Sequence, residues 1–166
     1  MKINIASNEV VHFIGIGGIG MSGLAQIMKN TGFIIQGSDS SRNKNTERLT
    51  KLGIKVYFGH HQKHLKKATM IVISSAIKKN NRELKFARSK KLPIFKRGDM
   101  LANIVALKKN IVVTGSHGKT TTTSLVANIL LEAGLDPTVI NGGVINSFKN
   151  TAQLGKGDWA VIESDE

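Results

Sequence analysis

The chain contains the stretch Ile111-Val-Val-Thr-Gly-Ser-His-Gly-Lys-Thr-Thr-Thr-Thr123, a short apolar run followed by a glycine-rich turn and a segment compatible with a helix. Its spacing is G-x-x-G-K-[ST], two residues shorter between the glycines than the usual phosphate loop. Glycines let backbone N–H groups curl around a polyphosphate, and the N-terminus of the following helix points at it. The sequence therefore predicts a strand, a phosphate loop and a helix, rather than a turn with an exposed lysine.

Three side chains of the chain have the chemistry needed to bind a nucleoside triphosphate with its metal ion. Lys119 supplies a cation, and the hydroxyl of Thr120 can ligate Mg²⁺. A later apolar run, 158–162, is expected to be a strand with Glu163 at its carboxyl end. A phosphate-loop fold places the second residue of its Mg²⁺ site, an acid, at this position. We therefore predict Lys119, Thr120 and Glu163 as catalytic residues, the last two as Mg²⁺ ligands.

A second glycine-rich turn lies near the start of the chain. The continuous apolar run Val10–Ile16 is typical of a strand in a parallel sheet, and it ends in Gly15-Ile-Gly-Gly-Ile-Gly20, which satisfies G-x-G-x-x-G. A helix over 21–29, a strand over 33–37 and then Asp39 follow. The glycines permit a tight turn and close approach of a diphosphate, and the acid can accept hydrogen bonds from ribose hydroxyls.

The alternation of strands and helices continues through the first part of the chain. We expect strands over 54–58, 68–73 and 92–95, and helices over 45–52, 81–88 and 98–106. This order predicts an α/β fold with a Rossmann-like, doubly wound parallel sheet. Ligands of such sheets lie at the carboxyl ends of the strands, where Gly15–Gly20 and the turn Ser74-Ser75-Ala76 are both expected.

The polar segment 107–110 predicts a domain boundary, with residues 1–107 before it and 108–166 after it. The second part is expected to hold a strand from Ile111, a helix through Ala133, strands over 137–140 and 158–162, and a turn at 141–143. Because these elements are too few for an ordinary phosphate-loop domain, we interpret 108–166 as the start of a truncated P-loop ATPase α/β domain.

Composition narrows the class of protein. The 166 residues include no cysteine, 40% are apolar, and no apolar run approaches the about 18 residues of a membrane span, so a cytoplasmic location and no membrane partner are expected. The net charge of +13 raises the possibility of nucleic-acid binding. The charge is scattered and mostly lysine, and one Tyr and one Trp supply few stacking platforms, so anionic small substrates are favoured over nucleic acid.

A histidine-rich segment lies between the two turns, at Gly59-His-His-Gln-Lys-His64. His60 and His64 are four residues apart and could share a helix face as metal ligands. No carboxylate or cysteine stands beside them, and neighbouring lysines would repel a cation. The interpretations favoured here are a loop histidine near a ligand, or plain solvent exposure.

Two nucleotide loops in one short chain are more specific than either alone. The stretch His12–Ala25 resembles the opening of the Mur ligases, and the chain's other motifs occur in that family's order. These are Gly37-Ser-Asp39, Ser74–Ile77, Pro93 with Arg97, Gly115–Thr121 and Glu163–Glu166. The chain departs from the family's usual pattern at Ser116, Ser164 and Gly98-Asp99.

The resemblance implies an ATP-dependent ligase that joins L-alanine to the carboxylate of UDP-N-acetylmuramate through an acyl phosphate, with ATP and Mg²⁺ as cofactors. This chain would be a fragment that binds the UDP-sugar without turnover; no oligomeric state is implied. His117 would help to maintain the conformation of the loop rather than act as a general acid or base. The implied ATP-binding residues are Gly115, Ser116, His117, Gly118, Lys119, Thr120 and Thr121. The implied UDP-substrate residues are Gly15, Gly17, Gly18, Ile19, Gly20, Asp39, Ser74, Ser75, Ala76 and Arg97.

Two other enzyme classes remain open on the sequence. An NAD(P)-dependent oxidoreductase would use Gly15–Gly20 and Asp39 but has no need for Lys119 and Thr120. A nucleic-acid-stimulated ATPase would use the positive charge, and it predicts strongly salt-dependent DNA binding.

Overall fold

The computed structural model describes residues 9–140, 152–153 and 155–164. The chain divides into two compact units, Met1–Asn103 and Ile104–Glu166. The boundary predicted at residues 107 and 108 stays a prediction.

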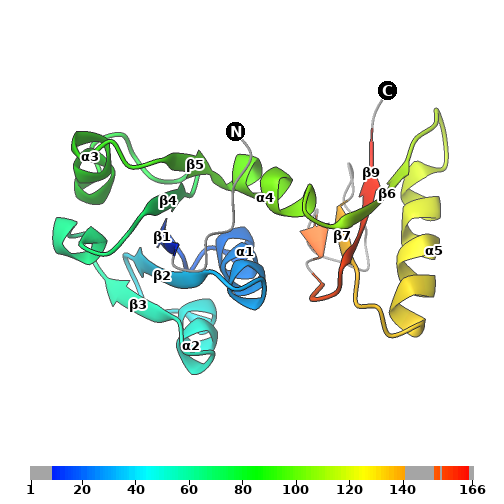
Figure 1. The fold of residues 1–166 in the computed structure, drawn as a ribbon, viewed down its shortest axis with the longest axis horizontal. Helices are drawn as coiled ribbons and strands as arrows, with labels where there is room; N and C mark the ends of the chain where they lie inside the picture. The colour runs from blue at the N-terminus through cyan, green and yellow to red at the C-terminus, as the bar shows by residue number, and fades with distance from the viewer. Residues whose placement is uncertain (1–8, 141–151, 154, 165–166) are drawn as a thin grey trace. The chain divides into compact units, whose positions relative to one another are not determined.

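The first unit alternates strands with helices along the chain (Figure 1). Its elements are β1 (Val10–Ile14), α1 (Ile19–Asn30), β2 (Ile34–Asp39), α2 (Lys44–Lys51), β3 (Lys55–Phe58), the 3₁₀ turn η1 (Gln62–Leu65), β4 (Met70–Ile73), α3 (Arg82–Ser89), β5 (Ile94–Lys96) and most of α4 (Arg97–Val105), whose last two residues belong to the second unit.

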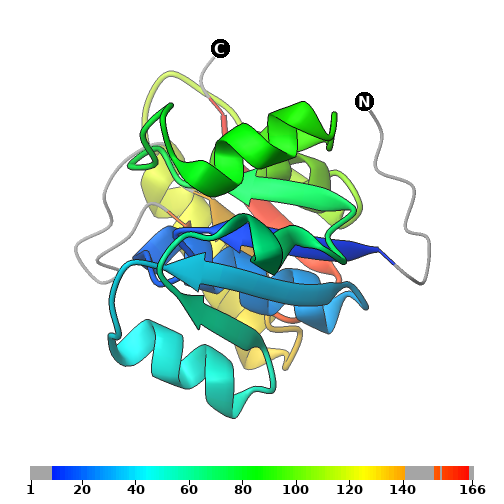
Figure 2. The same cartoon turned by 90° about the vertical axis from the view of Figure 1, so that its left-hand side faces the viewer.

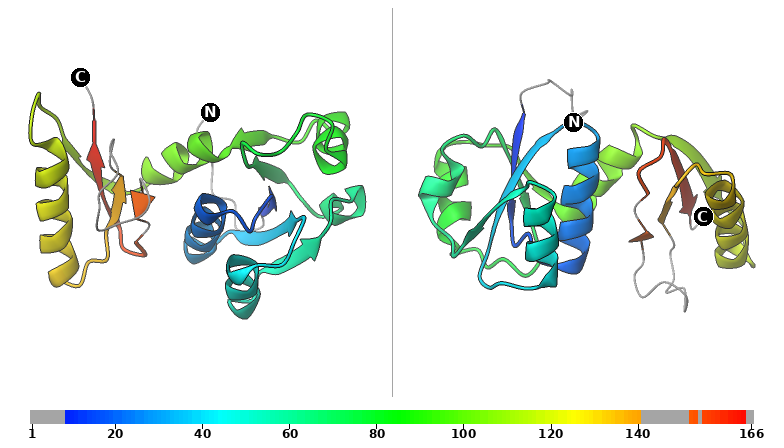
Figure 3. Two further views of the ribbon diagram at one scale, coloured as in Figure 1. Left: turned by 180° about the vertical axis from the view of Figure 1, so that it is seen from behind. Right: turned by 90° about the horizontal axis from the view of Figure 1, so that it is seen from below.

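The five strands form one parallel sheet in the order β3-β2-β1-β4-β5 (Figure 2). Helices α1 and α2 lie on one face of the sheet, and α3 and η1 lie on the other (Figures 1 and 3). Because β1 is central and covered on both faces, its Val11, Phe13 and Ile14 are completely buried. The doubly wound parallel sheet predicted from the sequence is confirmed.

Asparagine side chains begin two of the helices. The side chain of Asn43 accepts from the backbone N–H of Thr46, and the backbone N–H of Asn43 donates to the hydroxyl oxygen of Thr46, which completes a capping box at α2. Asn81 accepts from the N–H groups of Glu83 and Leu84 at the start of α3. Both caps lie in the loops that follow the carboxyl ends of β2 and β4.

Gly37 in β2 has no room for a side chain. A Cβ atom there would lie 2.7 Å from the backbone oxygen of Phe13 and 2.8 Å from Cβ of Ile16. We expect Gly37→Ala to lower the free energy of unfolding by about 3 kcal/mol, because the backbone of a central strand cannot move away cheaply. Urea unfolding followed by circular dichroism measures the change, and a loss below about 0.5 kcal/mol would contradict this packing.

The second unit has a smaller sheet of four strands in the order β6-β9-β7-β8. Its described elements are β6 (Lys109–Val113), α5 (Lys119–Glu132), β7 (Thr138–Ile140), β8 (Ala152–Gln153) and β9 (Trp159–Glu163). Strands β6, β9 and β7 are parallel, and β8 pairs antiparallel with β7. Helix α5 runs along the sheet (Figure 3). It packs Ala127 against Val139 and Val161.

Several elements differ from their predicted bounds. Strand β6 begins at Lys109, inside the segment interpreted as a polar break, because the N–H of Lys109 donates to the carbonyl of Asp158 and its ammonium lies over the Trp159 ring. Helix α4 begins at Arg97, one residue before the predicted start. Neither β8 nor η1 was predicted, and the turn expected at 141–143 lies outside the described residues.

Candidate functional site

The glycine-rich turn after β1 leaves the start of α1 open. Gly15 has a φ of 83°, a conformation that favours glycine, and its N–H donates to the carbonyl of Ser38 over 2.8 Å. The N-cap of α1 is Gly18, whose lack of a side chain leaves the helix without a side-chain cap. The first N–H groups of α1 are therefore available to an anionic group, as at other helix N-termini that bind phosphate.

A cleft of about 520 Å³ lies beside this turn. It is located where the strand order changes direction, between β1 and β4, and the N–H of Ser74 donates to the carbonyl of Ile14 across this point. The lining residues are Gly15, Gly17, Gly18, Asp39, Ser40, Asn43, His60, Ser74, Ala76, Ile77, Lys78, Asn80 and Asn81.

Asp39 binds the loop itself. Its Oδ2 accepts a hydrogen bond of 2.7 Å from the N–H of Gly17, and the carbonyl of Gly17 accepts from the side-chain amide of Asn45 over 2.8 Å. A Cβ atom at Gly17 would lie 2.7 Å from Nδ2 of Asn43 and 2.9 Å from Oδ2 of Asp39. The end of β2 and the start of α2 thus hold the peptide of Gly17 from both sides.

The predicted UDP-substrate residues divide into two groups. Those that line the cleft are Gly15, Gly17, Gly18, Asp39, Ser74 and Ala76. Ile19, Gly20, Ser75 and Arg97 do not line it, although Arg97 lies so close to Gly20 that a Cβ atom there would be 3.1 Å from its Cδ. The binding role of each residue stays a prediction.

Among the other lining residues, His60 was expected to be a loop histidine near a ligand or exposed to solvent, and no role was predicted for Ser40, Asn43, Ile77, Lys78, Asn80 and Asn81. The helix-capping pattern of Asn43 was a usable signal, because it places a side-chain amide beside the turn. Lys78 adds a positive charge to the cleft, which favours the binding of an anionic ligand.

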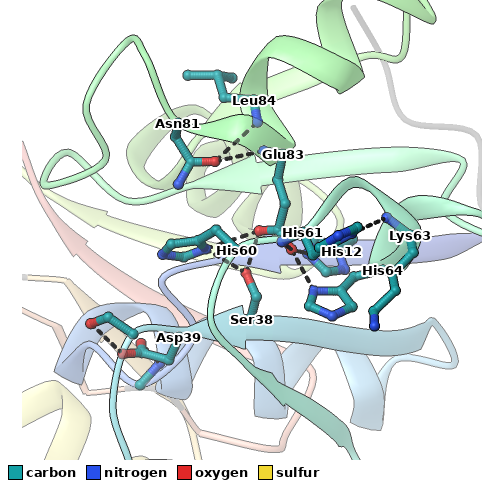
Figure 4. Close-up of polar contacts among 12 residues, drawn as sticks. His12, Ser38, Asp39, His60, His61, Lys63, His64, Asn81, Glu83 and Leu84 are labelled. Atoms are coloured by element: carbon teal, nitrogen blue, oxygen red, sulfur yellow. Dashed lines mark hydrogen bonds and ion pairs between the residues drawn. The ribbon is translucent and has the colours of Figure 1, made fainter.

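A buried carboxylate lies next to the cleft, with histidines around it (Figure 4). The side chain of Glu83 is fully buried, and its Oε1 lies 2.8 Å from Nδ1 of His64 while its Oε2 lies 3.0 Å from Nδ1 of His60. The hydroxyl of Ser38 donates to Oε2. Nε2 of His12 is 3.6 Å from Oε1.

The charge on Glu83 is stabilised by these neighbours. Burial by itself would raise the pKa of this carboxyl, but the favourable interactions with His12, Ser38 and His64 outweigh it and lower the pKa from 4.5 to about 2. The folded protein therefore holds Glu83 ionised at pH values where the same group in the unfolded chain becomes protonated.

This pKa predicts a loss of stability in acid. Above about pH 4.5 the carboxylate is ionised in both states and its contribution, about 3 kcal/mol, is fully present; the contribution falls as the pH drops toward about 2. Urea unfolding between pH 6 and pH 3 measures it. The Glu83→Gln variant, which has no carboxylate, is expected to lose less stability over this range, and parallel losses in the two proteins would contradict the prediction.

His60 and His64, the pair considered as metal ligands, are not plainly exposed, whereas His61 between them is exposed. His64 is buried and stacks on Tyr57 with ring centroids 4.3 Å apart, so the expectation of solvent exposure is wrong for it. His60 lines the cleft, as expected for a histidine near a ligand. Within the ranges that the structure describes, no group of three or more His, Cys, Asp or Glu side chains could hold a metal ion.

The phosphate loop of the second unit joins β6 to α5. Gly118 is in the left-handed conformation with a φ of 75°, and α5 begins immediately after it. Nζ of Lys119 donates to the carbonyl of Gly115 over 2.8 Å, which folds the lysine back over the loop. Ser116, His117 and Thr121 are exposed. The backbone thus has the curvature that the motif predicts.

The next strand brings an acid to this loop. Strand β9 runs parallel to β6 with Glu163 opposite Val113, and the N–H of Ser164 donates to the carbonyl of Val113. The hydroxyl of Thr120 donates to Oε1 of Glu163 over 3.0 Å. A hydroxyl and a carboxylate this close are hard oxygen ligands suited to Mg²⁺, which typically takes few protein ligands together with water and phosphate oxygens. The residues present therefore fit the ion.

No helix in the described part of the chain is both long and apolar enough to span a membrane.

Two family models match the chain in succession. "Mur ligase family, catalytic domain" matches residues 10–109, and "Mur ligase middle domain" matches residues 113–157. The two matches follow the same order as the two sheets.

Individual relatives of the chain have names that agree with these two family models. The chain is 64% identical, over all its 166 residues, to UDP-N-acetylmuramate–L-alanine ligase of Pelagibacter ubique (strain HTCC1062) and 52% identical to that of Brucella ovis (strain ATCC 25840 / 63/290 / NCTC 10512), and it spans 36% and 35% of their lengths.

Solved structures of two UDP-N-acetylmuramate ligases also match. UDP-N-acetylmuramate-alanine ligase from Thermotoga maritima has a TM-score of 0.68 and 34% identity, with 93% of this chain and 36% of that chain covered. UDP-N-acetylmuramate:L-alanyl-gamma-D-glutamyl-meso-diaminopimelate ligase from Neisseria meningitides has a TM-score of 0.69 and 34% identity, with 95% and 53% covered. Since the first family model alone covers more than half of the residues, the chain belongs to the Mur ligase family.

Proposed function

We propose that this chain is the substrate-binding part and the beginning of the ATP-binding part of a UDP-N-acetylmuramate–L-alanine ligase of peptidoglycan synthesis. The observation that carries the proposal is the 64% identity, over the entire chain, to the Pelagibacter ubique ligase. Two features of the fold support it: a cleft at the switch point of the first sheet, and a phosphate loop with Thr120 and Glu163 in the second. A cytoplasmic location and the absence of nucleic-acid and membrane partners stay predictions.

The first unit would bind the UDP group of the substrate. The open start of α1 offers backbone N–H groups to a diphosphate, and Gly17 and Gly18 let it approach the backbone closely. Lys78 lies on the same cleft and adds a positive charge. Asp39 holds the loop in place through the N–H of Gly17.

The second unit would bind ATP and begin the reaction. The γ-phosphoryl group is transferred to the muramoyl carboxylate to give an acyl phosphate, the amine of L-alanine attacks the acyl carbon, and phosphate leaves as the amide forms. Lys119 neutralises charge on the transferred group, while Thr120 and Glu163 would hold Mg²⁺. When bound, Mg²⁺ neutralises phosphate charge and aligns the oxygens of the transferred group. These steps depend on positioning and electrostatics.

The chain spans about 36% of the curated relatives it matches, so we propose that it binds the UDP-sugar but does not form the amide by itself. This binding property separates the proposal from the oxidoreductase alternative. Isothermal titration of the chain with UDP, UDP-N-acetylmuramate and NAD is the test. Binding of both UDP compounds with no heat from NAD is expected, and binding of NAD alone would overturn the proposal.

A further inference from the structure

The buried carboxylate of Glu83 has no part in the phosphate chemistry described above. Its partners come from separate elements of the first unit: His12 from β1, Ser38 from β2, His60 from the loop after β3, and His64 from η1. Placing a charged group where no solvent reaches it is costly unless it is well paired. A carboxylate that is buried beside a cleft is therefore expected to have a structural role that offsets this cost.

Gln36 determines the tautomer of His12. The side-chain nitrogen of Gln36 lies 2.8 Å from the carbonyl oxygen of His64 and 3.2 Å from Nδ1 of His12. A carbonyl oxygen only accepts, so the amide group facing it is the NH₂, and its second hydrogen is donated to Nδ1. The ring proton of His12 therefore lies on Nε2, the atom that faces Glu83.

The other end of the carboxylate determines the tautomer of His60. Ser38 uses its hydroxyl hydrogen on Oε2 of Glu83, which leaves the hydroxyl oxygen as an acceptor. Nδ1 of His60 lies 3.0 Å from that oxygen and 3.0 Å from Oε2. Since both neighbours accept at this position, Nδ1 carries a proton.

The remaining ring nitrogen of His60 is then left for the cleft. The ring is partly exposed, with 22% of the side chain accessible, and it lines the cleft together with Ser74 and Asn81. Because Nδ1 is occupied inside the fold, Nε2 lies across the ring from the buried contacts. In the neutral ring this nitrogen accepts a hydrogen bond, and it cannot donate one.

We propose that Glu83 is a positioning residue: with Ser38 it fixes the Nδ1–H tautomer and the orientation of His60, so that Nε2 accepts a hydrogen bond from an O–H or N–H group of the nucleoside in the cleft. The inference rests on the proposed UDP site and deepens it. The arrangement is the one by which a carboxylate sets the tautomer of a histidine in other sites. It also explains why a buried charge is placed in this part of the first unit.

The tautomer is tested on the unliganded protein. Long-range ¹H–¹⁵N correlation spectra distinguish a protonated ring nitrogen from an unprotonated one. The expected spectrum of His60 has Nδ1 protonated and Nε2 unprotonated at pH 8, whereas an Nε2–H tautomer would overturn the proposal. In the Glu83→Gln variant the fixed Nδ1–H signature is expected to be lost, and an unchanged signature would count equally against it.

The effect on the ligand is tested by titration with UDP. Glu83→Gln and His60→Gln are each expected to weaken binding about tenfold, and the double variant no more than either single one, because both remove the same hydrogen bond. His61→Gln is the matched control, since the ring of this neighbouring histidine contacts only the N–H of Lys63 among described hydrogen-bond partners. It is expected to bind UDP as the unaltered chain does.

The outcomes separate this inference from the proposed function. Unaltered affinity in both single variants, or losses that add in the double variant, would overturn the role of Glu83 while leaving the UDP site intact. Failure of the unaltered chain to bind UDP would overturn the proposed function, and the His60 spectrum would still decide the tautomer. His60 lines the cleft and is partly exposed. The UDP titration of His60→Gln therefore remains informative even if the buried substitution Glu83→Gln prevents folding.

Discussion

Replacing Lys119 by alanine is expected to lower kcat by about 10³-fold in a chimera in which this chain takes the place of the matching 36% of the Pelagibacter ubique ligase. Nζ of Lys119 is held over the phosphate loop by the carbonyl of Gly115. A cation in this position stabilises negative charge that develops as the γ-phosphoryl group is transferred. Release of inorganic phosphate measures the rate.

Lys109→Ala is the matched control for this substitution. It removes a lysine from the same unit, but one whose ammonium lies over the ring of Trp159 rather than in the loop. The control is expected to retain kcat within about twofold, since surface cation–π contacts contribute only about 0.5–1 kcal/mol to stability. A Lys119→Ala chimera that retained more than about a tenth of the rate would be incompatible with the assigned loop.

Replacing Gly17 by valine is expected to weaken UDP binding by about 100-fold or more, the cost of losing close contacts to a diphosphate. The new Cβ would fall within 3.0 Å of the side chains of Asn43, Asp39 and Thr46. Relief of the clash with Asp39 weakens its hydrogen bond from the N–H of Gly17, in a turn that lines the cleft. Isothermal titration with UDP measures the loss.

Gly98→Ala provides the comparison for this variant. Gly98 lies in the first turn of α4, its φ is not positive, and a Cβ atom there would meet nothing within 4 Å. It should therefore bind UDP normally and unfold at the same urea concentration or slightly higher. If Gly17→Val bound UDP as tightly as Gly98→Ala, the glycine-rich turn would not be the diphosphate site.

The two glycine-rich turns could be predicted from the sequence because the physics that forms them is local. A backbone that must adopt positive φ values and expose N–H groups requires glycine at fixed offsets, and this requirement is visible along the chain at Gly15 and Gly118. The parallel sheet was likewise predictable, since strands covered on both faces, such as β1, are continuously apolar.

The cluster around Glu83 could not be predicted in this way. Its members are separated by long stretches of sequence and are brought together only by the register of β1, β2 and β4 and by η1. Glu83 itself reads in the sequence as an ordinary first-turn acid of a helix, which it also is. Nothing local distinguishes a glutamate that faces solvent there from one that is buried among histidines.

In the second unit, the sequence predicted the local elements but not the exposure of their side chains. Helix α5 leaves apolar side chains such as Leu125 and Ile129 exposed, at 58% and 68%. The sequence could identify the loop and the helix of this unit, but it could not indicate which apolar side chains of the helix are exposed within the described residues. The interpretation of this region as the beginning of a larger domain agrees with the match to the Mur ligase middle domain.

The most direct measurement of the central claim is phosphate release by the chimera with each substrate omitted in turn. Release that requires ATP, UDP-N-acetylmuramate and L-alanine together, with one amide bond formed per phosphate, is the predicted result. ATP hydrolysis that is independent of UDP-N-acetylmuramate, or that is stimulated by DNA instead, would contradict the claim that this chain supplies the substrate site and the phosphate loop of a UDP-N-acetylmuramate–L-alanine ligase.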